Sequence, residues 1–242
     1  GIDSAMVAAI AVDALGASNV SALMLPSKFT SKESISDAED IASRLKIPLK
    51  TIAINDSVEC LAKTIDKLST DESSIMYQNL QSRIRGIILM AESNKTGALL
   101  LTTGNKSEYA TGYATIYGDM NGAFNPIKDV YKTELYELAR YKNVIPQHIL
   151  NKAPSAELTL NQKDSDSLPE YSILDKILEQ YIEYNSSKEE LSKQFKPELV
   201  DKVLKLVKNS EFKRRQSAPG VKISTKNFEK DRRFPITNHY DG

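Results

Sequence analysis

Two acidic residues occupy positions at which carboxylates can bind magnesium and phosphate. Asp3 and Ser4 stand at the start of a segment with helical periodicity, and Glu108 falls in the first turn of a later helix, shortly after the hydroxyl of Thr103. If both helices start at the same edge of a parallel sheet, their carboxylates can share a magnesium ion that also binds phosphate oxygens. The alternative is structural: Asp3 is a helix N-cap, and Glu108 offsets the positive end of its helix.

The order of the expected elements favours a common edge. Apolar runs typical of strands cover residues 19–25, 49–54 and 97–103. Segments with helical periodicity alternate with them, over residues 4–15, 31–45, 56–68 and 73–93. Alternation of this length predicts parallel βαβ units, and therefore an α/β fold with a doubly wound parallel sheet and helices on both faces. In such sheets, ligands bind beyond the carboxyl ends of the strands, near helix N-termini.

The chain becomes less regular after Pro126. It continues with a helical segment at 131–143, a polar loop at 152–171, helical segments within 171–209, and a basic, irregular tail from 213 onward. We therefore expect an α/β core over about residues 1–160. A helical C-terminal appendage and the tail, residues 161–242, should pack against this core.

The composition excludes several functional classes. The 242 residues include 32 basic and 32 acidic side chains, so no positive excess supports a large nucleic-acid surface. Cys60 is the single cysteine and lies in a helical apolar pattern, which predicts a buried, inert thiol. His148 and His239 are too few for a histidine metal centre, and we expect both to be structural or exposed. No apolar run reaches the ~20 residues of a membrane span, and a cytoplasmic location is expected.

Four separated segments resemble NAD synthetases, and they occur in the same order as in that family. They are "YQNLQSRIR" (77–85), "LLLTTGNKSEYATGYATIYGDMNGAFNPIKDVYKTEL" (99–135), "KAPSAEL" (152–158) and "FKRRQSAPGVKIS" (212–224). The opening "GIDSA" resembles the end of the Ser-Gly-Gly-x-Asp-Ser pyrophosphate loop of N-type ATP pyrophosphatases, the superfamily that includes NAD synthetases. The resemblance implies one NAD synthetase domain over residues 1–242 with an adenine-nucleotide alpha-hydrolase-like sheet.

The resemblance also suggests what lies outside this sequence. The Ser-Gly of the phosphate loop and the strand that precedes it are expected upstream of Gly1, so the domain is expected to be truncated there. The tail resembles that of glutamine-dependent NAD synthetases, which carry an N-terminal nitrilase-type glutaminase that supplies ammonia. Ile116 and Ala123 stand where many ammonia-dependent enzymes place a lysine and an aspartate, so those two contacts are not transferred. An ammonia-dependent enzyme remains the alternative.

The implied reaction is the ATP-dependent amidation of deamido-NAD to NAD⁺ through an adenylated intermediate, with release of AMP and pyrophosphate. The resemblance implies that Asp3 and Glu108 bind Mg²⁺. It assigns ATP binding to Gly1, Ser4, Thr103, Lys132 and Ser155, with Lys132 also catalytic through its contact with the phosphates. It assigns deamido-NAD binding to Asn79, Arg83, Tyr113, Thr115 and Lys213. Asp119 would remove a proton from incoming ammonium.

Other interpretations remain open at this stage. Asn79 and Arg83 lie four residues apart on one helix face, as surface partners do. Tyr113 is compatible with core packing. Lys213 is compatible with a solvated charge in a basic tail. Another ATP pyrophosphatase, of the GMP synthetase or tRNA-modifying type, would share the sheet, and an inactive nucleotide-binding fragment is a further possibility. The family resemblance implies a homodimer, and the helix at 73–93 is a candidate contact because its apolar positions exceed one stripe.

Overall fold

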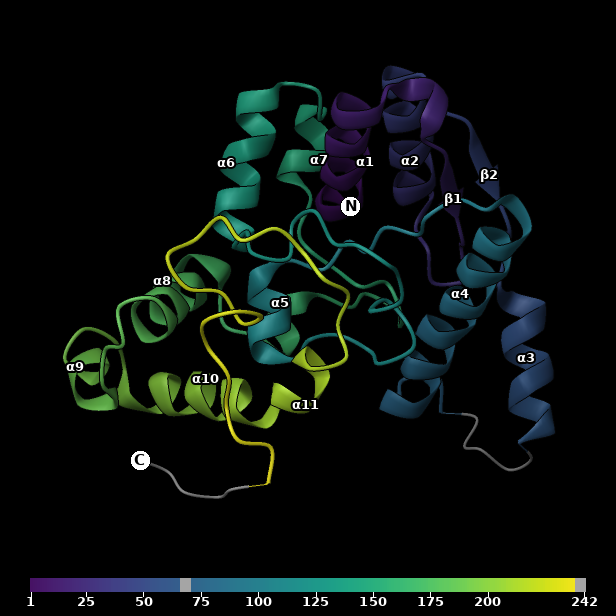
Figure 1. Ribbon diagram of the computed structural model, residues 1–242. Helices are drawn as coiled ribbons and strands as arrows, with labels where there is room; N and C mark the ends of the chain where they lie inside the picture. The colour runs from purple at the N-terminus through teal and green to yellow at the C-terminus, as the bar shows by residue number, and fades with distance from the viewer. Residues whose placement is uncertain (66–70, 238–242) are drawn as a thin grey trace.

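The computed structural model describes residues 1–65 and 71–237 (Figure 1). His239 and the end of the expected 56–68 helix lie outside the described residues. The α-helices are α1 (Ile2–Leu15), α2 (Lys32–Leu45), α3 (Asn55–Thr64), α4 (Ile75–Thr96), α5 (Lys106–Thr111), α6 (Lys132–Lys142), α7 (Gln147–Asn151), α8 (Tyr171–Ile182), α9 (Lys188–Ser192), α10 (Pro197–Asn209) and α11 (Glu211–Arg214). Short 3₁₀ helices cover Ala17–Asn19 and Asp164–Asp166.

The sheet within the described residues is a parallel pair, β1 (Ala22–Met24) and β2 (Leu49–Thr51), with Ala22 opposite Leu49. Side chains alternate between the two faces of a strand. Ala22 and Leu49 pack against the apolar cluster of α1, α2, α6 and α7, whereas Leu23 packs against the cluster of α3 and α4. Helices therefore cover both faces of the strand pair, which confirms the predicted α/β architecture.

The predicted strand at 97–103 differs from its expected form. Leu101 forms an isolated parallel bridge with Phe124, and the described residues show no pairing of this segment with β1 or β2. The close approach of Gly122 explains this pairing. A side chain there would have its Cβ 2.4 Å from Cγ2 of Thr102, and the φ of Gly122 is +147°. Only glycine lets the 122–124 segment lie this close to the extended segment.

Local signals account for several helix ends. Ser31 caps α2 and Ser74 caps α4, each by accepting a hydrogen bond from a backbone N–H three residues later. Gly97 ends α4 in the left-handed conformation, with a φ of 73°. The prediction of a buried Cys60 is wrong: its thiol is exposed, because the helical turn that buries Val58 of α3 directs Cys60 outward.

The appendage packs on the core through α5. Ala110 of α5 and Tyr131 share one apolar cluster with Leu174, Ile177 and Leu178 of α8, and with residues of α9 and α10. In Figure 1, α5 lies between α6 above and α10 below, and this cluster holds it against α8 and α10. In residues 1–65 and 71–237, no helix is long and apolar enough to cross a membrane.

Candidate active site

The two carboxylates singled out in the sequence converge in space. The Nζ atom of Lys132, at the start of α6, lies 2.6 Å from Oδ2 of Asp3 in α1 and 3.7 Å from Oε1 of Glu108 in α5. Lys132 is buried, and the other two side chains are mostly so. Three helices that are distant in sequence thus begin at one acidic cluster.

A capping box orients Glu108. Oδ1 of Asn105 accepts the backbone N–H of Glu108 at 3.0 Å, and Oε2 of Glu108 accepts the backbone N–H of Asn105 at 3.2 Å. The Asn105 amide also donates to Oδ1 of Asp3 at 2.8 Å. Asn105 was absent from the predicted site, although an Asn three residues before a Glu is a recognisable capping signal.

The alternative interpretation gave both acidic residues a purely structural role at their helix starts. It describes Glu108 only in part, and its N-cap role for Asp3 is wrong. Glu108 does cap its own helix, but with one carboxylate oxygen, while the other faces Lys132. Asp3 lies inside the first turn of α1 rather than at the N-cap, which is Gly1, and α1 has no side-chain cap. The Asp3 carboxylate instead contacts Asn105 and Lys132.

The cluster carries an electrostatic imbalance. Burial raises the pKa of Glu108 to about 8, with a further rise from Asp3 that Lys132 only partly offsets. Burial tends to lower the pKa of Lys132, yet the charges of Asp3 and Glu108 outweigh it and raise that pKa. A buried carboxyl that resists ionisation beside a second carboxylate is stabilised by additional positive charge. The cluster is therefore suited to a divalent cation with oxygen ligands.

Asp164 is a third acidic side chain near this cluster that the sequence did not reveal. It is buried, and one of its oxygens accepts the Tyr171 hydroxyl at 3.0 Å. Burial raises the pKa of Asp164, and the charges of Lys132 and Asp3 act on it in opposite directions. Among the described residues, no group of three or more His, Cys, Asp or Glu side chains could hold a metal ion.

A second cluster surrounds the loop after α5. Oδ1 of Asn79 accepts the Thr115 hydroxyl at 2.7 Å, and Nε of Arg83 donates to the Ile116 carbonyl at 3.3 Å. Nζ of Lys213 donates to the carbonyls of Gly112 and Ala114 at 2.6 and 2.7 Å. The structure therefore brings these sequence-predicted residues together, and their polar groups hold the loop in place.

Asp119 and Tyr113 belong to the same loop. Oδ1 of Asp119 accepts the Thr115 backbone N–H at 2.7 Å and lies 3.3 Å from the Ser82 hydroxyl. Burial raises the pKa of Asp119, while these hydrogen bonds oppose the rise. Burial also raises the pKa of Tyr113, together with the charge of Asp164. The Tyr113 ring packs against the apolar cluster of α8, α9 and α10.

The remaining predicted residues form local contacts. The Ser4 hydroxyl donates to the Gly1 carbonyl at 3.2 Å, and both residues are exposed. The Ser155 hydroxyl donates to the Gln162 carbonyl at 2.5 Å within its own loop. Thr103 is half-buried and directly precedes Gly104, where a Cβ would lie 2.8 Å from the Tyr109 ring. These residues lie outside the hydrogen-bonded cluster of Asp3, Asn105 and Lys132.

The NAD synthase family model matches residues 1–217, nearly the whole chain. The chain belongs to the NAD synthase family. This confirms the resemblance seen in the four motifs, and the NAD synthases of known structure support the α/β nucleotide-binding fold.

Known NAD synthases and a neighbouring synthetase show the extent of the match. The chain is 50% identical to the glutamine-dependent NAD(+) synthetase of Xanthomonas campestris pv. campestris, over 100% of this chain and 45% of that protein. A glutamine-dependent NAD+ synthetase from Acinetobacter baumannii, in complex with ADP, aligns at a TM-score of 0.61 and 42% identity, over 98% of this chain and 44% of that one. NMN synthetase from Francisella tularensis aligns at a TM-score of 0.76 and 28% identity, over 88% of this chain and 83% of that one. The chain thus spans about half the length of the glutamine-dependent relatives.

Proposed function

We propose that the chain is the synthetase part of a glutamine-dependent NAD⁺ synthetase. It would catalyse the ATP-dependent amidation of deamido-NAD to NAD⁺ through an adenylated intermediate. The observation that carries this proposal is the convergence of Asp3, Glu108 and Lys132 at the start of three helices. The family relationship, and the ADP complex of the Acinetobacter relative, support nucleotide binding by this domain.

The reaction needs charge neutralisation and alignment. A nicotinate carboxylate is anionic and lacks a good leaving group, so ammonia cannot attack it productively. The carboxylate instead attacks the α-phosphorus of ATP, and pyrophosphate leaves. Ammonia then displaces AMP to form the amide. Positioning of the reactants and stabilisation of charge on the phosphates supply most of the rate enhancement in such a reaction.

The two carboxylates of the cluster would supply part of a magnesium site, and the phosphates of ATP would supply further oxygen ligands. Asp3 and Glu108 carry the oxygen ligands that Mg²⁺ prefers, and the burial of Glu108 beside Asp3, which raises its pKa, supports added positive charge there. When bound, the ion would draw electron density from phosphate oxygens and favour departure of pyrophosphate. Lys132 would place its ammonium against the same phosphates. Because burial favours its neutral form but two carboxylates reverse this, Lys132 stays charged.

The other assignments follow the resemblance to NAD synthetases. We assign ATP contacts to Gly1, Ser4, Thr103 and Ser155. We assign deamido-NAD contacts to Asn79, Arg83, Tyr113, Thr115 and Lys213. Asp119 would accept a proton from incoming ammonium, and its burial supports this role because a raised pKa makes a carboxylate a stronger base.

Partners of the whole protein are also part of the proposal. A glutaminase domain would supply ammonia, the enzyme would act as a homodimer, and it would be cytoplasmic. The exposed apolar side chains of Ile75, Ile87 and Met90 on α4 support a subunit contact along that helix. The name of the Xanthomonas relative supports glutamine as the nitrogen source.

Exchange of radiolabelled pyrophosphate into ATP tests the proposal without any nitrogen donor. The whole protein should catalyse this exchange only when both deamido-NAD and Mg²⁺ are present, since adenylation is reversible. Nicotinate mononucleotide in place of deamido-NAD is the matched comparison, because one structural neighbour is named an NMN synthetase. Exchange with the mononucleotide alone would reassign the substrate, and exchange with neither would refute the proposed adenylation.

A further inference from the structure

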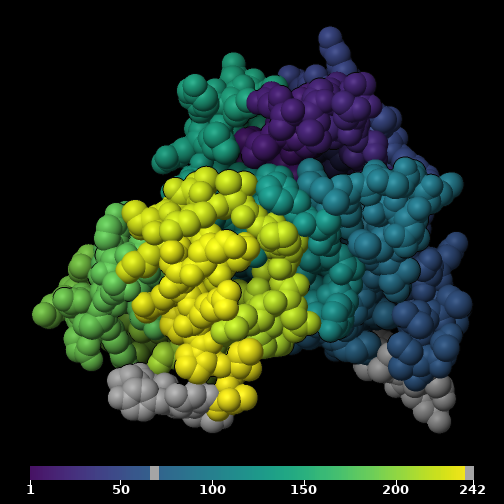
Figure 2. All heavy atoms as spheres, in the orientation of Figure 1, coloured from purple at the N-terminus to yellow at the C-terminus, as the bar shows by residue number. Residues whose placement is uncertain are grey.

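The C-terminal segment 219–231, here named the strap, is irregular, as the sequence predicts, with one isolated bridge between Asn125 and Gly220, and it packs against the rest of the chain. It lies beyond residues 1–217, which the family model matches. In the space-filling view the yellow C-terminal atoms lie on the near face of the molecule, beside the green and teal parts of the chain (Figure 2). The backbone N–H of Asn125 donates to the Pro219 carbonyl at 2.9 Å, and Lys128 pairs with Glu229 at 3.3 Å.

A fully buried lysine joins the strap to α5. Nζ of Lys106 lies 2.9 Å from Oδ1 of Asp129 and 2.8 Å from Oε1 of Glu183, and it donates to the Ser224 hydroxyl at 2.7 Å and the Lys226 carbonyl at 3.0 Å. The Lys106 side chain has no solvent exposure. An ammonium with this number of acceptors is fully satisfied, which a buried charge requires.

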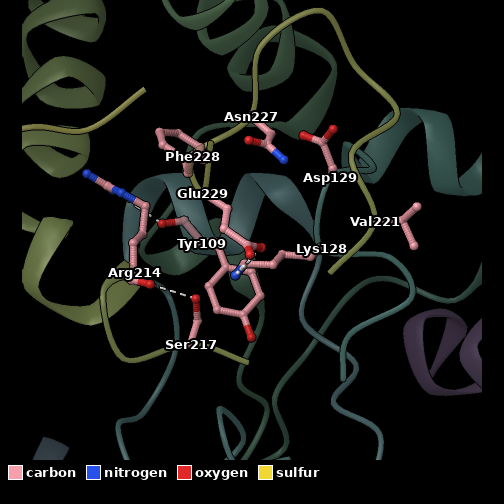
Figure 3. Close-up of a pocket in the computed structure, with 9 residues that line it drawn as sticks. All are labelled: Tyr109, Lys128, Asp129, Arg214, Ser217, Val221, Asn227, Phe228 and Glu229. Carbon is pink, nitrogen blue, oxygen red and sulfur yellow. Dashed lines mark hydrogen bonds and ion pairs between the residues drawn. The ribbon is translucent and has the colours of Figure 1, made fainter. Parts of the chain in front are cut away.

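The strap closes the other side of this ion cluster. Asp129 accepts the backbone N–H groups of Ile223 and Ser224 at 2.9 and 2.8 Å. Glu183 accepts both the backbone N–H and the hydroxyl of Thr225. A small pocket next to this cluster, between the strap and α5, is lined by Tyr109, Asp129, Asn227 and Phe228 (Figure 3). The strap is thereby held by the same two carboxylates that hold Lys106.

The four residues that open α5 divide into two pairs. Asn105 and Glu108 face the acidic cluster. Lys106 and Ser107, between them, are buried and anchored elsewhere: Ser107 donates to Asp175 of α8 at 2.5 Å and accepts the Lys132 backbone N–H at 2.9 Å. A six-residue helix has little stability of its own, so these anchors set its orientation.

We propose that Lys106 is a positioning residue, and that the strap, through Ser224, holds the start of α5 so that Asn105 and Glu108 face Asp3 and Lys132. This inference rests on the proposed function for its catalytic consequence. Its structural consequence, a strap-dependent order of α5, can be measured independently of any activity.

Hydrogen exchange and pyrophosphate exchange in the whole protein test the inference together. Lys106→Met should speed amide exchange in α5 at least tenfold relative to α10, and should lower kcat at least tenfold with the KM for deamido-NAD unchanged. Ser224→Ala, which leaves every site residue intact, should give the same pattern with a threefold to fivefold effect. Lys230→Ala, an exposed lysine of the same strap, is the control and should match the unsubstituted protein.

The outcomes separate the two proposals. Equal acceleration of exchange in α5 and α10, or unchanged exchange in α5, would overturn the positioning role. If Lys106→Met does not fold, Ser224→Ala decides by the same criteria. If the unsubstituted protein lacks pyrophosphate exchange, the proposed function fails, while amide exchange in α5 still decides whether the strap orders this helix.

Discussion

Glu108→Gln in the whole protein is expected to lower the rate of adenylation by at least about 10³-fold, or roughly 4 kcal/mol of transition-state stabilisation. The substitution keeps the side-chain shape and an oxygen that can accept the Asn105 N–H, so α5 should keep its cap. It removes the carboxyl group that would ionise on binding the proposed ion. Release of pyrophosphate in a single turnover measures the effect.

Glu134→Gln is a matched control for this loss. Glu134 occupies the same capping-box position at the start of α6, where its Oε2 accepts the Tyr131 N–H at 2.8 Å. Since no site role is assigned to Glu134, its variant should retain pyrophosphate release. Equal rates for Glu108→Gln and the unsubstituted protein would refute the metal-binding role of Glu108.

Lys132→Met is expected to slow adenylation by about 10²–10³-fold and to destabilise the fold by about 3–5 kcal/mol. The rate falls because an ammonium no longer faces the phosphates. The stability falls because the mostly buried Asp3 carboxylate loses its cation at 2.6 Å. Chemical denaturation and single-turnover pyrophosphate release measure the two effects on the same preparation.

The control for this variant lies on the same helix. Lys142 also joins α6 to α1, through an ion pair with Asp13, but this pair is at the surface. Exposed ion pairs contribute about 0–1 kcal/mol, so Lys142→Met should change neither stability nor rate appreciably. Similar destabilisation by both variants would show that the burial of Lys132 has no special energetic role.

The convergence of Asp3 and Glu108 could be predicted because it follows from topology. Alternating strands and helices place helix N-termini at one sheet edge, and the three apolar runs that alternate with helical segments indicated that order. The third predicted strand, 97–103, does not pair with β1 or β2 in the described residues. Its Leu101 pairs with Phe124 instead, and that pairing depends on the approach of Gly122 to Thr102. That contact between separate segments leaves little periodic trace in the sequence.

The residues that the sequence missed are those placed by long-range packing. Asp164 lies in a polar loop, and only the folded chain buries it against Tyr171. Lys106 lies in the 99–135 segment that resembles NAD synthetases. Its partners Glu183 and Ser224, however, come from the appendage and the strap, far away in the sequence. Local propensity contains no information about such partners, whereas the Asn105–Glu108 capping box is a local signal present in the sequence itself.

The most direct measurement is the location of Mn²⁺, used in place of Mg²⁺, by anomalous diffraction from crystals of the whole protein with a non-hydrolysable ATP analogue and deamido-NAD. Binding of the ion between the carboxylates of Asp3 and Glu108, in contact with the analogue's phosphates, is the expected result. A manganese peak bound to neither carboxylate, with Lys132 still paired to Asp3 and the phosphates elsewhere, would contradict the proposed site.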